Sequence, residues 1–268
     1  MTAICQKSLP DAPWAQAQTR RLPGVQPLDP ATWIVVDDAY ASQMAERTRL
    51  LAESRSDVLQ IQPDALPAAR ELLRMVLAHL GARDGFEIGA ANCTRPDGQT
   101  AVIDHGAPLE TLCHLVTEDF CILQKRGTEH VLTAGLLCFP ASWTLAEKFG
   151  HPLMRIHAPV DSYTDNMAKR VQRLFDAVRA DRPLWRANAM LYHDPTLFQP
   201  RPEAAPRTER TGGDYLRSER QCILRLPVSD AVIFSIHTRQ VALGDLTPDQ
   251  AEALRRHPID GAFESAGA

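Results

Sequence analysis

The sequence predicts an α+β protein in which helices pack on an antiparallel sheet, and three observations predict it. In the N-terminal half, apolar residues recur every three or four positions, most regularly over residues 66–80, as in a helix with one buried face. In the C-terminal half, residues 184–192, 220–226 and 231–238 have the length and composition of strands. Helices and strands do not alternate along the chain, which argues against a repeated βαβ unit.

The N-terminal half begins with a segment rich in proline. The prolines of residues 1–30 predict an extended arm, and residues 31–268 are expected to form a single domain with a large core. Asp37 or Asp38 is expected to cap the first long helix, and Pro108 to begin a later one.

A hairpin is predicted in the middle of the chain, where two apolar runs at residues 120–124 and 130–139 flank a turn. Ser142 is then expected to cap a short helix over residues 143–149. Gly150 is expected to end that helix in a left-handed conformation.

Three further segments complete the prediction. Residues from Asp165 to Val178 show helical apolar spacing, and residues 194–213 form a long loop with several prolines and glycines. Thr247 and Gln250 have the spacing of a capping box, so a last short helix is expected to begin there.

Composition and charge exclude several classes of function. The net charge of −4 gives no electrostatic attraction to nucleic acid or to anionic lipid, so neither partner is expected. No apolar run approaches the roughly 20 residues that span a bilayer, and the first residues lack a secretory pattern. The six cysteines are scattered, which indicates reduced thiols, no structural zinc and a cytoplasmic location.

Motifs that bind nucleotide phosphates are absent from the sequence. Neither G-x-G-x-x-G nor G-x-x-x-x-G-K occurs, so the chain is not expected to bind NADPH or a nucleoside triphosphate in those ways. The hydrolase motif G-x-S-x-G and the zinc motif H-E-x-x-H are absent as well.

Two histidines stand in apolar surroundings, where an imidazole is costly without a partner. His157 precedes a proline turn, and His237 lies near the end of the strand predicted at residues 231–238. Each is either a core histidine with hydrogen-bonded neighbours or, because neutral imidazole binds haem iron, an axial ligand or acid–base group. The sequence leaves both alternatives open.

Charged residues beside apolar segments form a second set of candidates. Arg217 and Arg220 lie near the start of a predicted strand, either in surface ion pairs or as forks that bind carboxylates. Glu118 and Asp119 follow a predicted helix, where negative charge opposes the helix dipole. That conflict indicates a role for these acids beyond solvation.

Five stretches, in this order along the chain, carry a resemblance to a known family. They are PGVQPLDPATWIVVDDAYASQMAERTRLL (23–51), LVTEDFCIL (115–123), LTAGLLCFPASWTLAEKFGHPLMRIHAPV (132–160), DRPLWRANAMLYHDP (181–195) and RSERQCILRLPVSDAVIFSIHT (217–238). In these stretches the chain resembles the α-subunit of haem-dependent oxidative N-demethylase and the bacterial and fungal family around it.

The resemblance implies a PAS-like domain, with helices on one side of an antiparallel sheet, that holds haem b. It implies an oxygen-using monooxygenase that removes a methyl group from a small secondary amine, with electrons from NADPH delivered by a separate flavin and iron–sulfur reductase. On this basis His157 is predicted to ligate the iron. His237 is the rival ligand, and Arg217 or Arg220 is predicted to hold the haem propionates.

The substrate site is predicted from the same resemblance. Glu118 or Asp119 is expected to hold the ammonium group by a charge-assisted hydrogen bond. The chain departs from the family where Thr117 replaces glutamine, Ala189 stands near an expected tryptophan and His237 replaces a frequent arginine. Two other interpretations stay open: a haem- or ligand-binding PAS sensor or carrier without turnover, and a cofactor-free protein with structural histidines.

Overall fold

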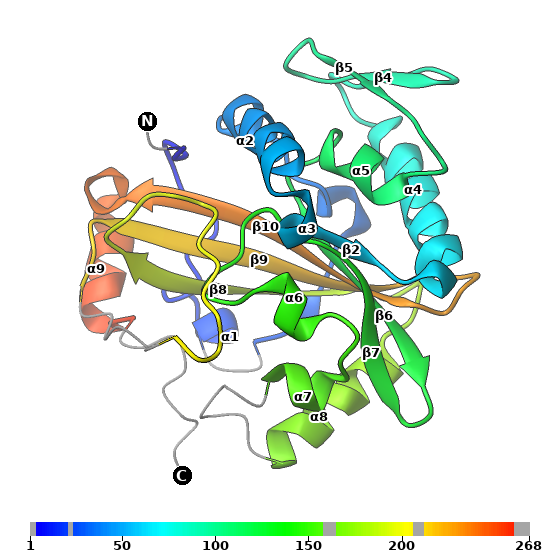
Figure 1. Ribbon diagram of the computed structural model, residues 1–268. Helices are drawn as coiled ribbons and strands as arrows, with labels where there is room; N and C mark the ends of the chain where they lie inside the picture. The colour runs from blue at the N-terminus through cyan, green and yellow to red at the C-terminus, as the bar shows by residue number, and fades with distance from the viewer. Residues whose placement is uncertain (1–3, 21–23, 158–164, 206–211, 260–268) are drawn as a thin grey trace.

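The computed structural model describes residues 4–20, 24–157, 165–205 and 212–259, without the side chains of residues 157 and 165–169. In these residues seven strands form an antiparallel sheet in the order β1-β8-β9-β10-β6-β7-β2, and three more form a small sheet in the order β3-β4-β5. Helices lie around the large sheet (Figure 1). The predicted α+β class is therefore confirmed, while the PAS-like character of the fold remains a prediction.

The large sheet contains β1 (Gln26–Pro27), β2 (Leu59–Ile61), β6 (Asp119–Arg126), β7 (Glu129–Leu136), β8 (Leu184–Tyr192), β9 (Tyr215–Arg225) and β10 (Val232–Ala242). The small sheet contains β3 (Glu87–Ile88), β4 (Asn92–Thr94) and β5 (Thr100–Val102). The α-helices are α1 (Ala17–Arg20), α2 (Tyr40–Glu53), α3 (Arg55–Val58), α4 (Leu66–Leu80), α5 (Pro108–Cys113), α6 (Leu145–Lys148), α7 (Leu153–His157), α8 (Asp165–Ala177) and α9 (Pro248–Arg256). Single 3₁₀ turns are η1 (Pro30–Thr32), η2 (Pro63–Ala65) and η3 (Leu243–Asp245).

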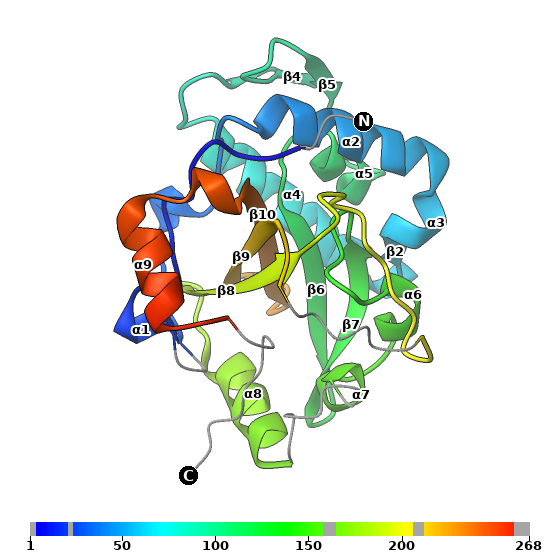
Figure 2. The same ribbon diagram turned by 90° about the vertical axis from the view of Figure 1, so that its left-hand side faces the viewer.

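Helices pack on both faces of the large sheet. We call one side the α4 face: it carries Phe120, Ile122 and Leu224, which pack with residues of α2, α4 and α5. We call the other side the α8 face: it carries Leu123 and Ile223, which pack with residues of α6, α7 and α8. Figure 2 shows α2 and α4 on one side of the strands and α7 and α8 on the other. The resemblance implied helices on one side only, but both sets of alternating strand residues are apolar, so both faces need cover.

The helix predicted over residues 66–80 is α4, with the same bounds. Leu72, Leu73, Val76 and Leu80 are fully buried, as their helical spacing indicates. Each such side chain stabilises the fold by about 1.5–3 kcal/mol. A regular apolar stripe therefore predicted this helix and the face that it buries.

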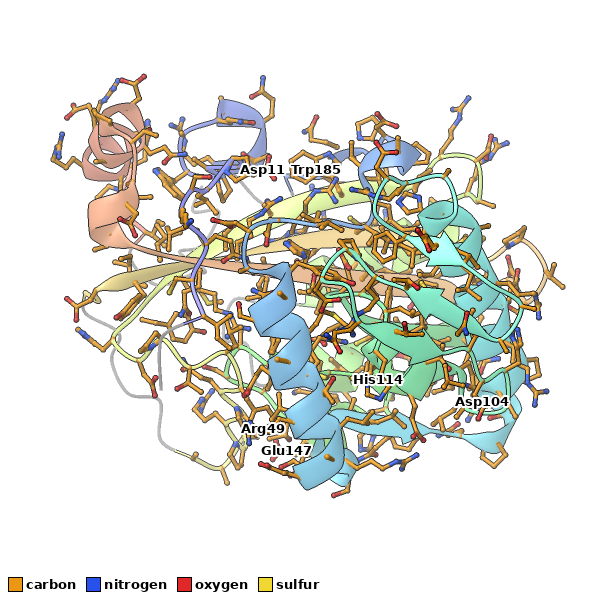
Figure 3. All side chains as sticks on the ribbon, turned by 90° about the horizontal axis from the view of Figure 1, so that it is seen from above. Asp11, Arg49, Asp104, His114, Glu147 and Trp185 are labelled. Carbon is orange, nitrogen blue, oxygen red and sulfur yellow. The ribbon has the colours of Figure 1, made fainter. Side chains whose placement is uncertain are left out.

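The helix expected after Asp37 or Asp38 is α2, but neither aspartate is its N-cap. Ala39 is the N-cap residue, and Asp37 accepts the N–H of Ala39 at 3.1 Å instead. α2 begins one residue later at Tyr40 and carries Arg49 on its exposed side, as seen from above in Figure 3. The second carboxylate oxygen of Asp37 contacts His237, as described below.

The predicted hairpin is confirmed by the antiparallel pairing of β6 with β7. The second strand ends at Leu136 rather than at residue 139, because the Asp119 carboxylate accepts the N–H groups of Cys138 and Phe139, each at 2.8 Å. A side chain thereby replaces the neighbouring strand as the acceptor for these backbone groups.

The cap of the next helix differs from the prediction. α6 begins at Leu145 with Thr144 as its N-cap, and the Thr144 hydroxyl accepts the N–H of Glu147 at 3.4 Å. Ser142 has a φ of 66° and so lacks the extended conformation of an N-cap residue. Gly150 has a φ of 77°, the left-handed conformation expected there.

β9 begins at Tyr215, well before the start predicted at residue 220. Its first residues include Arg217 and Glu219, whose charges hide the strand from a search for apolar runs. Both side chains are nevertheless buried, and their backbones pair in register with β8 and β10. The extension places charged groups inside the sheet.

The N-terminal segment lies along the domain. β1 pairs with β8, and Leu9 and Trp14 pack with Leu216 and Val241. The predicted division between an arm over residues 1–30 and a single domain thereafter remains a prediction.

At the other end, α9 begins with the predicted capping box. The Thr247 hydroxyl accepts the N–H of Gln250, and the Gln250 side chain accepts the N–H of Thr247. The capping box is thus confirmed.

The six cysteines form no disulfide. They are less scattered in space than in sequence, since the sulfur atoms of Cys113 and Cys138 lie 3.7 Å apart. In the described part of the chain, no helix combines the length and the apolar character needed to cross a membrane.

Candidate functional site

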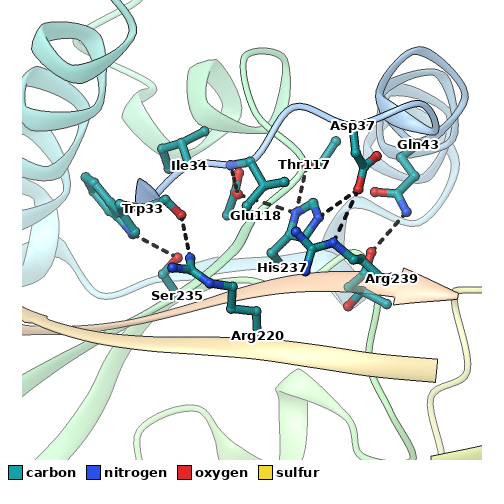
Figure 4. A network of polar contacts seen from close by, with 12 residues as sticks. Trp33, Ile34, Asp37, Gln43, Thr117, Glu118, Arg220, Ser235, His237 and Arg239 are labelled. Atoms are coloured by element: carbon teal, nitrogen blue, oxygen red, sulfur yellow. Dashed lines mark hydrogen bonds and ion pairs between the residues drawn. The ribbon is translucent and has the colours of Figure 1, made fainter. Parts of the chain in front are cut away.

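A cluster of buried polar groups surrounds His237 on the α4 face (Figure 4). The Nε2 atom of His237 lies 3.2 Å from Oδ2 of Asp37. Its Nδ1 atom lies 3.2 Å from the hydroxyl of Thr117 and 3.4 Å from Oε1 of Glu118. The imidazole of β10 is therefore held between two carboxylates from distant parts of the sequence.

The two carboxylates set the protonation of the ring. Burial lowers the pKa of His237, but hydrogen bonding to Asp37 and Glu118 outweighs it, so the pKa lies above its usual value. Burial raises the pKa of Asp37, but the hydrogen bond and the charge of His237 outweigh it, so that pKa lies below its usual value. Both shifts favour an imidazolium ion paired with carboxylates.

These contacts argue against His237 as an iron ligand. A ligating imidazole offers a nitrogen lone pair, whereas a protonated ring has none. Glu118 is also engaged, because its Oε1 accepts the N–H of Val35 at 2.7 Å. Its Oε2 atom is buried and accepts no hydrogen bond from the described chain. The cluster resembles a structural ion-pair network more than an open site.

Asp119, the other predicted substrate carboxylate, is paired with Arg47. The two side chains are buried, and NH1 of Arg47 lies 2.6 Å from Oδ1 of Asp119. Arg47 also donates to the backbone carbonyls of Thr117 and Glu118. Together with the two backbone N–H groups already described, these contacts occupy both oxygens of Asp119. They favour a structural role for this carboxylate.

Arg220 lies on the α4 face and is engaged as well. It donates to the backbone carbonyl of Trp33 at 3.3 Å and to the hydroxyl of Thr32 at 3.0 Å. Its guanidinium lies over the ring of Trp185, 5.2 Å from the centroid. These contacts fasten the segment before α2 onto β9.

Arg217 points to the opposite, α8 face. It donates to the backbone carbonyls of Leu197 and Phe139, and its guanidinium lies 5.7 Å from the ring centroid of Tyr192. The two arginines predicted as alternatives for the haem propionates therefore belong to opposite faces of the sheet, and both make protein contacts.

His157 is the last residue of α7, next to residues outside the description. Its side chain is not among those described, so its role as iron ligand remains a prediction. α7 packs on the α8 face through Leu153 and Ile156. The structure thus places the backbone of His157 and the ring of His237 on opposite sides of the sheet.

The α8 face contains a group of partly exposed side chains in the middle of the sheet. We call them the β8–β10 strip: Leu184, Arg186, Asn188 and Met190 of β8, Gln221 of β9 and Phe234 of β10. Their strands are interior strands of the sheet, where side chains are normally covered. The strip therefore keeps apolar and polar groups accessible in the middle of the sheet, and we take it as a candidate place for a ligand.

Arg186 is the unusual member of the β8–β10 strip. Its guanidinium makes no hydrogen bond or ion pair with the described chain, and its Nε atom is buried. Burial lowers the pKa of Arg186, and only the charge of Glu219 opposes that shift. A partly buried cation without a partner is costly, so this position suits an anion.

Glu219 is close to Arg186 in the sheet but is committed to other groups. Its Oε2 accepts hydrogen bonds from Asn188 at 3.2 Å and from Gln221 at 3.0 Å. Its Oε1 lies 3.5 Å from NH2 of Arg217. The carboxylate is thereby shared among three donors, and Arg186 is left without an acceptor among the described residues.

Among the residues described, no group of three or more His, Cys, Asp or Glu side chains is arranged to hold a metal ion. A haem does not need such a group, because the porphyrin supplies most of the iron ligands and the protein one or two axial side chains.

The β8–β10 strip of this α+β protein thus combines accessible apolar groups with an arginine that has no partner in the described chain. Comparison with protein families identifies the family of the chain. The family described as "Haem-dependent oxidative N-demethylase, alpha subunit-like" matches residues 24–261. The chain belongs to this family, so the resemblance found in the sequence is confirmed.

Sequence reasoning missed Arg186, although a signal was present. Residues 184–192 were recognised as a strand, and strict alternation places Leu184, Arg186, Asn188 and Met190 on one face. An arginine at the centre of such a face needs a partner, and only the structure shows that none of the described residues supplies one.

Proposed function

We propose that this chain is the haem-binding subunit of an oxidative N-demethylase and that it holds haem b on the α8 face. The observation that carries the proposal is the family match over residues 24–261. The β8–β10 strip supports it, because an apolar surface beside an unpartnered arginine suits a flat apolar ring with acidic side groups.

The residues of the α8 face fit this cofactor. Leu184 and Phe234 offer apolar surface, which would exclude water from the ring. Arg186 offers a cation for a carboxylate. We propose His157 as the axial ligand, since α7 packs on this face and the sequence motif around it matches the family. When bound, haem would supply the reaction with O2, and the protein would orient the amine and control water and protons.

The first test is reconstitution with hemin. Titration of the purified chain is expected to produce a Soret band that saturates at about one haem per chain. A preparation that stays colourless and takes up no added hemin would contradict the proposal. The cofactor-free interpretation predicts that outcome.

The second test separates the two histidines. His157→Ala is expected to weaken haem binding or shift the ferric spectrum, with partial recovery on addition of imidazole. His237→Ala is the matched control: it should lower stability but leave the spectrum of the bound haem unchanged, because the ring is held by Asp37 and Glu118. The opposite pattern would assign the ligand to His237.

The third test concerns the source of electrons. We propose a separate flavin and iron–sulfur reductase that uses NADPH, because the sequence contains no dinucleotide-binding loop. With NADPH alone, the pure chain should not reduce its haem, whereas chemical reduction or an added reductase should start O2 consumption. Rapid reduction by NADPH and the pure chain would contradict this.

Formaldehyde release from a small secondary amine distinguishes the enzyme from a haem-binding sensor or carrier. We propose the enzyme, because the family description names a demethylase. A chain that binds haem, accepts electrons and releases no formaldehyde from any N-methyl amine would favour the sensor or carrier.

A further inference from the structure

We propose that Arg186, rather than Arg217 or Arg220, binds a carboxylate of the haem. The inference rests on the proposed function, since it names the residue of this chain that recognises the acidic side groups of the cofactor. It follows from a comparison of the arginines in the molecule and from the neighbours of Arg186.

The other arginines with little exposure have acceptors that are already supplied by the protein. Three of them pair with aspartates: Arg47, Arg95 and Arg239. Three others donate to backbone carbonyls: Arg217, Arg220 and Arg225. Arg186 has no such acceptor in the described part of the chain. Its planar set of donors is therefore available for a carboxylate, which it can bind with two hydrogen bonds.

The neighbours of Arg186 prepare the site for an added negative charge. The nearest carboxylate in the sheet, that of Glu219, is held by the amides of Asn188 and Gln221 and lies beside Arg217. Its charge is thus shared with other donors, while the amides next to Arg186 are neutral. An incoming carboxylate would pair with Arg186 without displacing an existing partner.

The same residues set the shape of the ligand. Leu184 and Phe234 join the apolar cluster of the α8 face and are partly exposed. A ligand that reaches Arg186 from this surface needs an apolar body as well as an acid. A haem carries both, with carboxylates at one edge of an apolar ring.

Hemin and its dimethyl ester provide the test, because the ester has the same ring without the two carboxylates. Wild-type protein is expected to bind hemin about tenfold to a hundredfold more tightly than the ester, the range of a charge-assisted hydrogen-bonded pair. Arg186→Gln should bind the two compounds with nearly equal affinity. Arg186→Lys should keep part of the preference, since it keeps the charge but not the fork.

Arg182→Gln is the matched control. Arg182 is exposed in the turn before β8 and close to Arg186 in sequence, so its loss should leave the preference for hemin intact. Retention of the full preference in Arg186→Gln would overturn the proposal. If the wild type takes up neither compound, the proposed function itself fails, and this outcome is distinct from the failure of the Arg186 assignment.

A free carboxylic acid is the other source of a carboxylate, and acetate is the probe for it. Equal binding of hemin and its ester by the wild type, together with an acetate-dependent rise in melting temperature that Arg186→Gln loses, would overturn the proposal in favour of a small acid. No effect of acetate together with a clear preference for hemin would support the haem carboxylate.

Discussion

Two regions of the large sheet treat buried charge in different ways: the polar groups around His237 and Asp119, and the β8–β10 strip. In the first region, Arg47 is paired with Asp119, and His237 with Asp37 and Glu118. In the β8–β10 strip, Arg186 has no partner in the described chain. Charges that hold a fold together are paired within it, because an unpaired buried charge costs several kcal/mol. The unpaired guanidinium of Arg186 is therefore the basis on which we propose a ligand at this position.

The largest effect on the free energy of unfolding is expected at the Arg47–Asp119 pair. Asp119→Asn should lower the free energy of unfolding by about 3–5 kcal/mol, because it leaves the guanidinium of Arg47 buried without a counter-charge. Urea unfolding measures this difference. Asp181→Asn, which removes an exposed partner of Arg179, should cost about 1 kcal/mol or less.

If Asp119→Asn does not fold, the double variant Arg47→Gln, Asp119→Asn keeps the test decisive. Removing both charges together should restore part of the lost stability, because no unpaired charge is left buried and the amides can still hydrogen-bond to the neighbouring backbone groups. A catalytic role for Asp119 without a structural one predicts instead a stable Asp119→Asn protein, which would break the contrast between the two regions.

The second effect depends on pH and concerns His237. The folded-state pKa of His237 is raised, so its contribution is fully present below its unfolded pKa of about 6.5 and is lost as the pH rises through the folded value. The pKa of Asp37 is lowered, so its contribution is present above about 3.9 and is lost as the pH falls through the folded value. The pair is most stabilising between these limits.

Comparison with His237→Gln tests this pH dependence. The wild type should exceed the variant by about 1–3 kcal/mol in free energy of unfolding near the acidic side of neutrality. The advantage should shrink in alkaline buffer. If the wild type exceeds His237→Gln by the same free energy of unfolding in mildly acidic and in alkaline buffer, the ring is neutral in the folded protein. That result would reopen the role of His237 as a ligand.

The third and smallest effect on stability is expected at Arg225, which lies on the same face as Arg186 but has partners within the fold. Arg225 donates to the backbone carbonyls of Val178 and Phe175 and so fastens α8 to β9. Arg225→Leu should lower the free energy of unfolding by about 1–2 kcal/mol, because these carbonyls lose their donor. Chemical denaturation without haem measures it. A neutral result would mean that contacts of this kind do not stabilise the α8 side.

The sequence predicted the elements with regular apolar spacing and missed those that depend on distant partners. The bounds of α4 followed from its helical periodicity, and the pairing of β6 with β7 followed from two apolar runs on either side of a turn. The start of β9 did not, because Arg217 and Glu219 are polar and become buried only beside their neighbours. A local sequence pattern does not show which residues of distant strands become neighbours. The register between the strands determines which charged side chains come into contact.

The candidate site shows the same limit. His157 and His237 were equally plausible as ligands from their local surroundings, yet the register of β10 places the ring of His237 between two carboxylates. Asp37 lies 200 residues away from it in the chain. Arg186 was within a stretch that matched the family, but its lack of a partner is a property of the folded protein.

The most direct measurement is the stability of Arg186→Leu in the absence of haem. If Arg186 is kept for a ligand, the change removes an unpaired, partly buried charge, and the free energy of unfolding by urea should stay equal to that of the wild type or rise. The same variant should lose affinity for hemin. A fall of about 1 kcal/mol or more without haem, as expected when a paired group is removed, would show that Arg186 stabilises the fold and would contradict the account.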